Sequence, residues 1–213
     1  MKIIVFGATG DVGSRVAKEA LLRGHDVSAV VRDENKLDRL PRAASVRVLD
    51  VTDTKTMAQV VAGYDLAISA LRPPDGREKE LPELTKLVLN AAAETKIRVL
   101  VVGGAANLLM PDMSGHTVLT APNFLPEVVK PIAAACFTQF AYCVADDQAD
   151  WTYFSPPAML EPGRRTGHYR RGSDILLVDE AGHSKISMED FAVAMMDEAE
   201  TPTENVKRVT VAY

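Results

Sequence analysis

The fold of this chain is decided by its N-terminal stretch, Lys2-Ile3-Ile4-Val5-Phe6-Gly7-Ala8-Thr9-Gly10-Asp11-Val12-Gly13. The first five residues form an almost continuous apolar run, which is typical of a strand buried on both faces. A glycine turn with the spacing G-x-x-G-x-x-G follows, and a helical apolar pattern then runs to Gly24. Residues 26–31 have the pattern of a second strand. A strand, a glycine turn, a helix and a strand within about 30 residues form the βαβ unit of a dinucleotide-binding sheet.

The three glycines have separate physical tasks in such a unit. Gly7 allows the sharp turn out of the strand, and Gly10 lets the backbone approach the phosphates without a Cβ in the way. Gly13 lets the helix pack closely on the sheet. A pyrophosphate is then held at the helix N-terminus, where unpaired N–H groups and the helix dipole favour negative charge. The alternative, an ordinary turn, does not explain why a strand and a helix flank the glycines.

Arg32 follows the second strand, where an NAD-binding unit commonly carries an acidic residue for the ribose 2′-hydroxyl. A guanidinium at this position can bind a 2′-phosphate through charge-assisted hydrogen bonds. The sequence therefore predicts NADP(H), in its reduced form NADPH, as the cofactor. The alternative is that Arg32 is a solvated charge at a strand end.

Composition restricts the classes of function. The chain has 213 residues, of which 47% are hydrophobic and 25% charged, and a net charge of −5. This balance is that of a globular protein, and its sign argues against nucleic acid or an anionic membrane as a partner. We find no apolar run approaching the roughly 18 residues of a membrane span and no signal peptide, so we expect a cytoplasmic protein. Cys136 and Cys143 are expected to be reduced core residues, and no cysteine or histidine spacing suggests a metal site.

Strand and helix patterns alternate along the rest of the chain. This alternation predicts one α/β domain over residues 1–213, a doubly wound parallel sheet of the Rossmann type with strand order 3-2-1-4-5-6 and a C-terminal strand. A short helix is expected over residues 34–40 and a short strand over 174–178. Ligands of such sheets lie beyond the carboxyl ends of the strands. Those ends are expected at Gly7–Gly13, Arg32, Asp50-Val51, Ala70-Leu71 and Gly103-Gly104.

Two segments break the alternation and are expected to form the acceptor pocket. They are residues 105–124, a long loop that contains His116, and residues 156–172. Long loops in compact domains are commonly lids or binding loops, although a surface excursion is the alternative. The second segment carries the only concentration of basic residues in the sequence. Arg165 and Arg170 are the candidates for holding an anionic acceptor, and a solvated basic hairpin is the alternative.

These motifs together resemble one family. Gly7-Ala8-Thr9-Gly10 with Gly13, the strand end at Arg32, Asp50-Val51-Thr52-Asp53 and Asp150-Trp151-Thr152 with Ser155-Pro156 are similar to the atypical short-chain dehydrogenase/reductases. Within them, residues 161–170 resemble the NAD(P)H-binding NADH–flavin reductases, which are relatives of biliverdin reductase B. The resemblance implies that Thr9, Gly10, Asp11 and Val12 contact the pyrophosphate and that Asp50 and Val51 flank the adenine. It places Ala70, Leu71 and Gly103 beside the ribose and nicotinamide, and Pro156-Pro157 near the carboxamide.

The departures from the family pattern concern acid–base chemistry. Typical short-chain dehydrogenases use a Tyr-x-x-x-Lys pair and a serine after the fifth strand, and this sequence has neither. Ala158 also replaces the histidine that follows the proline pair in biliverdin reductase B. These differences argue against a carbonyl dehydrogenase, an epimerase or a tetrapyrrole reductase. No catalytic side chain is assigned.

The sequence therefore predicts an NADPH-dependent oxidoreductase that passes a hydride to a small-molecule acceptor, a flavin such as FMN or FAD or a quinone-like compound. Such acceptors need little from the protein beyond correct placement. The alternative is an NADP-binding redox sensor that binds a protein partner without turnover, because a fold and a cofactor site do not establish chemistry.

Overall fold

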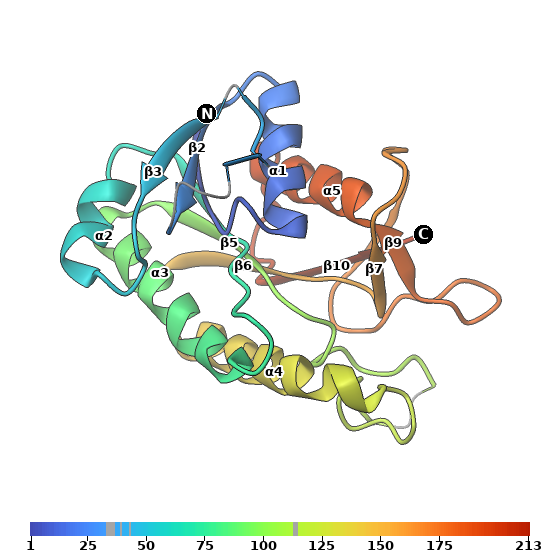
Figure 1. The fold of residues 1–213 in the computed structure, drawn as a ribbon. Coiled ribbons are helices and arrows are strands. Elements are labelled where there is room, and N and C mark those ends of the chain that lie inside the picture. Colours follow the sequence, from blue (N-terminus) through green and yellow to red (C-terminus); the bar gives the residue numbers. More distant parts are fainter. Residues whose placement is uncertain (33–36, 39, 43, 113–114) are drawn as a thin grey trace.

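The computed structural model describes residues 1–32, 37–38, 40–42, 44–112 and 115–213. Strands of the main sheet are β1 (Lys2–Phe6), β2 (Asp26–Val31), β3 (Ser45–Val48), β4 (Leu66–Ser69), β5 (Arg98–Val102), β6 (Asp150–Ser155), β8 (Arg170–Gly172) and β10 (Arg208–Ala212). Within the described residues their order is β3-β2-β1-β4-β5-β6-β10-β8, and only β8 runs antiparallel to its neighbour. Strands β2, β3, β5, β6 and β10 of this sheet are labelled in Figure 1. The predicted Rossmann sheet, with strand order 3-2-1-4-5-6 and a C-terminal strand, is confirmed.

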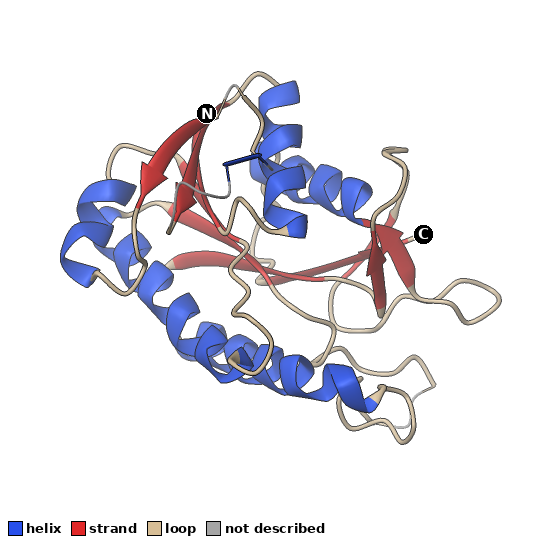
Figure 2. Ribbon diagram, viewed as in Figure 1, coloured by secondary structure: helices blue, strands red, loops and turns tan. Residues whose placement is uncertain are grey.

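Helices cover both faces of this sheet (Figure 2). They are α1 (Asp11–Leu22), α2 (Thr54–Val61), α3 (Leu81–Thr95), α4 (Lys130–Ala145) and α5 (Met188–Glu200). The helices α1 and α5 pack together on one face over a core that includes Val16, Ala20 and Met195. The helices α2, α3 and α4 lie on the other face. Two apolar layers therefore enclose the sheet and leave its carboxyl edge free for a ligand.

The register of the parallel strands brings their carboxyl ends to one level. Phe6 at the end of β1 pairs with Ser69 at the end of β4, and Val102 at the end of β5 pairs with Phe154 of β6. The loops that follow β1, β4, β5 and β6 consequently leave the sheet beside one another. This edge is where the sequence places the cofactor.

Two local predictions concern a strand over residues 174–178 and a helix over residues 34–40. The short strand predicted over residues 174–178 is wrong, because only an isolated bridge joins Leu109 and Ile175 there. The neighbouring residues form β8 instead, and a separate parallel pair, β7 (Met159–Glu161) with β9 (Lys185–Ser187), accompanies it. Strands of three residues carry too little alternation to be recognised from sequence. The helix predicted over 34–40 falls mainly on residues outside those described.

The helix α4 restarts at a proline, as its sequence indicates. A 3₁₀ turn (Glu127–Val129) precedes it, and Pro131 lies in its first turn. The stretch Glu127–Ala145 is long and apolar enough to cross a membrane by length and composition, with 22% of its residues buried. Its inner face packs on the sheet through Cys143, and both Cys143 and Cys136 are buried, free cysteines as expected. The expected absence of a membrane partner stays a prediction.

Candidate cofactor and acceptor site

The glycine turn brings three backbone segments closer than side chains would allow. Gly7 has φ +74°, and a Cβ on it would lie 2.3 Å from the carbonyl oxygen of Ala70 at the end of β4. A Cβ on Gly13 would lie 2.2 Å from the carbonyl oxygen of Gly7. Gly10 is the N-cap residue of α1, and its amide donates to Gly7 (2.9 Å). The N-terminal amides of α1 are therefore presented at the carboxyl edge of the sheet by a cradle that any Cβ would fill, which fits a pyrophosphate.

A pocket of about 710 Å³ opens beside this turn. It collects residues that lie far apart in the sequence, from the ends of β1, β2 and β4 and from the segment after β3. The residues predicted to bind cofactor that line it are Gly7, Thr9, Gly10, Arg32, Asp50, Val51, Ala70 and Leu71. Ala8 is fully buried beneath the turn. The pocket has the place and composition expected of a site for the adenosine half of a dinucleotide.

Asp50 and Arg32 lie close together among the charged residues of this pocket, which also include Asp38, Arg72, Arg77 and Glu80. The Asp50 carboxylate accepts hydrogen bonds from the backbone amide of Thr52 (2.9 Å) and from its hydroxyl (2.8 Å). These bonds, together with the nearby charge of Arg32, hold the pKa of Asp50 below its usual range. Asp50 is therefore a fixed anion and hydrogen-bond acceptor beside a guanidinium.

A second pocket, of about 700 Å³, continues the crevice past the glycine turn. The two pockets share Gly10, Ala70, Leu71, Arg72, Pro73 and Pro74. The predicted residues lining the second pocket are Gly10, Asp11, Val12, Ala70, Leu71, Gly103, Gly104, Pro156 and Pro157. Most of its remaining lining is apolar. One continuous crevice can therefore hold an extended dinucleotide and leave an apolar space at its far end.

The second pocket offers few groups that could transfer a proton. Among the described residues that line it, the charged ones are Asp11, Arg72 and Asp75, and none is a tyrosine or histidine. Cys136 also lines it, and burial raises the pKa of this thiol to about 11. A thiol with that pKa remains neutral at physiological pH. The described residues also contain no group of three or more histidine, cysteine or acidic side chains that could hold a metal ion.

A sequence profile of the NAD(P)H-binding family matches residues 7–202. The chain belongs to that family. It is 32% identical to the uncharacterized protein YwnB of Bacillus subtilis over 213 residues, which is 99% of this chain and 98% of YwnB. The solved structure of a "putative NADH-flavin reductase" from Streptococcus pneumoniae is 30% identical to this chain in sequence, with a TM-score of 0.89. The match covers 100% of this chain and 99% of that protein. The solved structure of a "putative epimerase" from Bacteroides thetaiotaomicron is 35% identical to this chain, with a TM-score of 0.88. The match covers 100% of this chain and 96% of that protein.

Family membership confirms the prediction of an NAD(P)H-binding oxidoreductase on a Rossmann sheet. The cofactor of the family fits the glycine cradle and the continuous crevice described above. The residues that would hold it follow the carboxyl ends of the six parallel strands β1 to β6, where ligands of such sheets bind.

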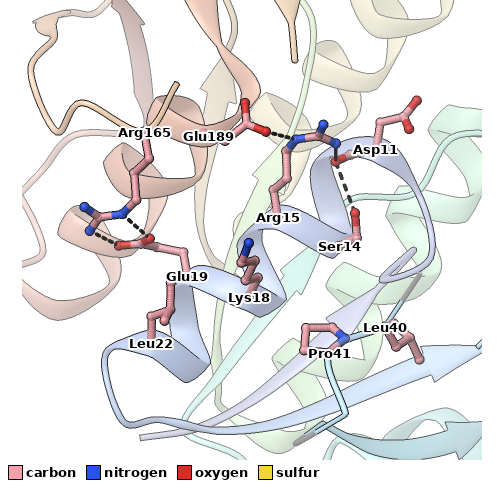
Figure 3. A pocket seen from close by; sticks show the side chains of 10 residues that line it. All are labelled: Asp11, Ser14, Arg15, Lys18, Glu19, Leu22, Leu40, Pro41, Arg165 and Glu189. Atoms are coloured by element: carbon pink, nitrogen blue, oxygen red, sulfur yellow. Dashed lines mark hydrogen bonds and ion pairs between the residues drawn. The ribbon is translucent and has the colours of Figure 1, made fainter. Parts of the chain in front are cut away.

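The candidate arginines of the basic segment, Arg165 and Arg170, do not line the second pocket. The Arg165 guanidinium makes two bonds to the Glu19 carboxylate (2.7 and 2.8 Å) on the outer side of α1 (Figure 3). There it lines a separate pocket of about 610 Å³, together with Arg15, Lys18 and Glu189. Arg170 donates to the backbone carbonyl oxygens of Val178 and Tyr213. Both arginines thus have structural partners outside the crevice, and this differs from the predicted role.

The boundaries of the acceptor pocket also differ from those predicted. Of residues 105–124, the pocket uses Ala105, Ala106 and Val118, and His116 is not among its lining residues. Of residues 156–172, it uses Pro156, Pro157, Ala158 and Leu160. The rest of its wall comes from residues that the sequence does not assign to it, namely Arg72–Asp75, Leu81, Val102, Met188, Leu125, Val129, Ile132, Ala133 and Cys136. The helical pattern of α4 marks these last residues as apolar, but a pattern does not distinguish a core position from a pocket wall.

We expect Arg165→Ala to leave the KM for an anionic acceptor such as FMN unchanged within about twofold, a change worth well under the 1.4 kcal/mol of a tenfold effect. The reason is that Arg165 binds Glu19 outside the crevice. Steady-state kinetics with FMN, and with uncharged lumiflavin as the control acceptor, measures this. A KM for FMN that rises at least tenfold while that for lumiflavin stays constant would restore Arg165 to the acceptor site.

Proposed function

We propose that this member of the NAD(P)H-binding family uses NADPH to reduce a flavin or a quinone-like acceptor. The observation that carries the proposal is the second pocket, which is apolar, adjoins the dinucleotide crevice and lacks a lining tyrosine or histidine among the described residues. A carbonyl or epimerase substrate needs a positioned acid or base, whereas a flavin or quinone needs mainly correct placement. The similarity to the Streptococcus pneumoniae protein supports the same choice.

The roles of the residues follow from their places in the crevice. The amides at the start of α1, from Thr9 to Val12, hold the pyrophosphate, and Arg32 holds the 2′-phosphate. Asp50 and Val51 flank the adenosine. Gly103 and Gly104 form the floor on which the nicotinamide rests, and Pro156 and Pro157 border its carboxamide side.

Bound NADPH supplies the hydride for the reaction. The protein aligns the two reacting rings and keeps bulk water from the apolar wall formed by Val118, Leu125 and Ile132. The reduced acceptor can take its proton from water at the open side of the pocket. The chain is therefore expected to work by placement of two planar molecules against each other.

The experiment that tests this proposal is NADPH oxidation measured with FMN, with a quinone such as menadione, and without an acceptor. The proposal predicts oxidation that depends on both protein and acceptor. Tight NADPH binding without turnover with either acceptor would contradict it and favour the alternative of a redox sensor.

Substitution of Tyr142, Tyr153 and Tyr169 tests whether the protein supplies a general acid to the reaction. Tyr142 donates to Glu83 (2.9 Å) and Tyr169 donates to Asp197, both outside the pocket lining. Tyr153 is buried below the lining backbone. We expect Tyr142→Phe, Tyr153→Phe and Tyr169→Phe each to keep kcat for FMN within about tenfold, because a general acid contributes 10²–10⁴-fold. A loss of 10²-fold or more in any of them, with NADPH affinity intact, would identify a protein acid.

A further inference from the structure

Tyr153 lies directly beneath the floor of the second pocket. It belongs to β6, its side chain is fully buried, and its ring meets the ring of Phe140 edge-on at 4.9 Å between centroids. A Cβ on Gly103 would lie 1.9 Å from Cζ of this ring. The backbone amide of Gly104 donates to the Tyr153 hydroxyl (3.2 Å). The ring and the hydroxyl thus support the two glycines from the side opposite the pocket.

The hydroxyl of Tyr153 also ties this floor to the two helices that form the pocket wall. It donates to Oε1 of Gln139 (2.9 Å), with the carbonyl oxygen of Cys136 at 3.2 Å. Nε2 of Gln139 donates to Thr85 (2.9 Å), whose hydroxyl donates to the carbonyl oxygen of Leu81 (3.0 Å). Cys136 and Leu81 line the pocket, and the other three side chains are buried. A buried and connected polar network of this kind fixes the positions of its members.

The pKa and the position of the Tyr153 hydroxyl are those of a structural hydrogen-bonding group, not of a general acid that reaches the acceptor. Burial raises the pKa of Tyr153 well above its ordinary value, so the group remains a neutral donor. It is not among the residues that line the pocket. Its influence on a ligand therefore passes through the lining residues that it contacts, which are Gly103, Gly104 and Cys136.

We propose that Tyr153 is a positioning residue, which holds the Gly103–Gly104 peptide at the height and tilt that the nicotinamide ring needs for hydride transfer. This inference rests on the proposed function, which places the nicotinamide on that floor. Without the hydroxyl, the Gly104 amide and the Gln139 carbonyl lose a buried partner and the floor can shift. Transfer between two aligned rings is sensitive to such displacements.

The experiment compares Tyr153→Phe with Tyr142→Phe, the same substitution at a hydroxyl bonded to Glu83 away from the floor. Three quantities are measured: the midpoint of thermal unfolding without ligand, the Kd for NADPH and for adenosine 2′,5′-bisphosphate, and the single-turnover rate with FMN. We expect Tyr153→Phe to weaken NADPH and to slow transfer by about three- to tenfold, the size of one hydrogen bond. Binding of the bisphosphate, which lacks the nicotinamide, should stay within about twofold, and Tyr142→Phe should change none of these constants.

The double variant Tyr153→Phe/Gln139→Met separates positioning from general destabilisation. It also removes the unpaired Gln139 carbonyl, so the unfolding midpoint should recover in part, whereas the loss in NADPH affinity should remain because Gly104 still lacks its acceptor. Equal losses for NADPH and the bisphosphate, or recovery of NADPH affinity together with the midpoint, would overturn the proposal. If the wild-type protein fails to reduce FMN, the proposed function fails, while the comparison of the two affinities still decides the role of Tyr153.

Discussion

Arg32→Ala is expected to weaken NADPH binding by about 10- to 150-fold and to leave NADH binding nearly unchanged. A charged hydrogen bond to a phosphate is worth about 1.5–3 kcal/mol, and NADH lacks the 2′-phosphate that receives it. Arg32 is exposed at the pocket that holds the adenosine half, beside the fixed anion of Asp50. Fluorescence titration of both cofactors measures the two dissociation constants directly.

A matched control for this prediction is Arg47→Ala. Arg47 is also an exposed arginine near this edge of the sheet, on β3, but it does not line the pocket. Its removal changes the net charge equally and should alter NADPH affinity by less than about threefold at physiological salt, because exposed charges are screened. Equal losses of NADPH and NADH affinity in Arg32→Ala would show that Arg32 acts on the general shape of the pocket instead of on the 2′-phosphate.

Glu198→Gln is expected to lower the free energy of unfolding by about 3–5 kcal/mol, because it leaves two guanidinium groups without their anion. Glu198 lies on α5 with no exposed surface, and its carboxylate binds Arg98 of β5 and Arg171 of β8, each at 2.5 Å. It also accepts from the amide (3.1 Å) and hydroxyl (3.0 Å) of Thr203. Urea denaturation of both proteins measures the difference.

The same substitution two residues further along α5 provides the control. Glu200 binds Arg23 and His25 with a partly exposed side chain, and Arg23 keeps Glu19 and Asp197 as partners. Glu200→Gln should therefore cost no more than about 1 kcal/mol. Similar losses for the two variants would show that burial of the Glu198 cluster adds nothing to stability.

The effect of Glu198→Gln should also depend on pH. Burial raises the pKa of Glu198, but hydrogen bonds from Arg171, Thr203 and Arg98 outweigh this and place it below its usual value. A carboxyl with a lowered folded-state pKa stabilises the protein fully above its unfolded pKa of about 4.3 and loses that contribution as the pH falls through the folded value. The gap between wild type and variant should thus be full at pH 5–7 and shrink in acid. A gap that widens in acid would contradict this assignment.

The features that the sequence predicts well are local or repeated along the chain. The spacing of Gly7, Gly10 and Gly13 implies close backbone contacts, and in the structure a Cβ added to Gly7 or Gly13 would lie only 2.2–2.3 Å from a backbone oxygen. Alternating strand and helix patterns and right-handed crossovers, together with the glycine turn of a dinucleotide-binding unit, predict the observed strand order. Residues at the carboxyl ends of strands then share an edge by topology alone, which explains why Arg32, Asp50 and Ala70 line one pocket.

The features that escape prediction depend on contacts between distant segments. Arg165 and Glu19 are 146 residues apart, and nothing in either neighbourhood indicates that they pair. Ile132 and Cys136 lie on the apolar stripe of α4, where a pocket wall and a core position have the same composition. Tyr153 has the pattern of any buried strand residue, and its bond to Gly104 depends on the register of β5 and β6. The hydrophobic pattern of the sequence predicts which side chains are removed from water, whereas only the tertiary packing determines which of them line a ligand pocket.

An anaerobic single-turnover experiment tests whether NADPH bound in this crevice passes its hydride to a flavin in the adjoining pocket. Protein saturated with NADPH is mixed rapidly with FMN, and the absorbance bands of NADPH and of oxidised FMN are followed together. If the hydride passes directly between the two bound molecules, both bands decay with one rate constant and one FMN is reduced for each NADPH oxidised. The rate should also greatly exceed that of the same mixture without protein. Decay of the NADPH absorbance no faster than in the mixture without protein, although NADPH is bound, would contradict direct hydride transfer to the flavin.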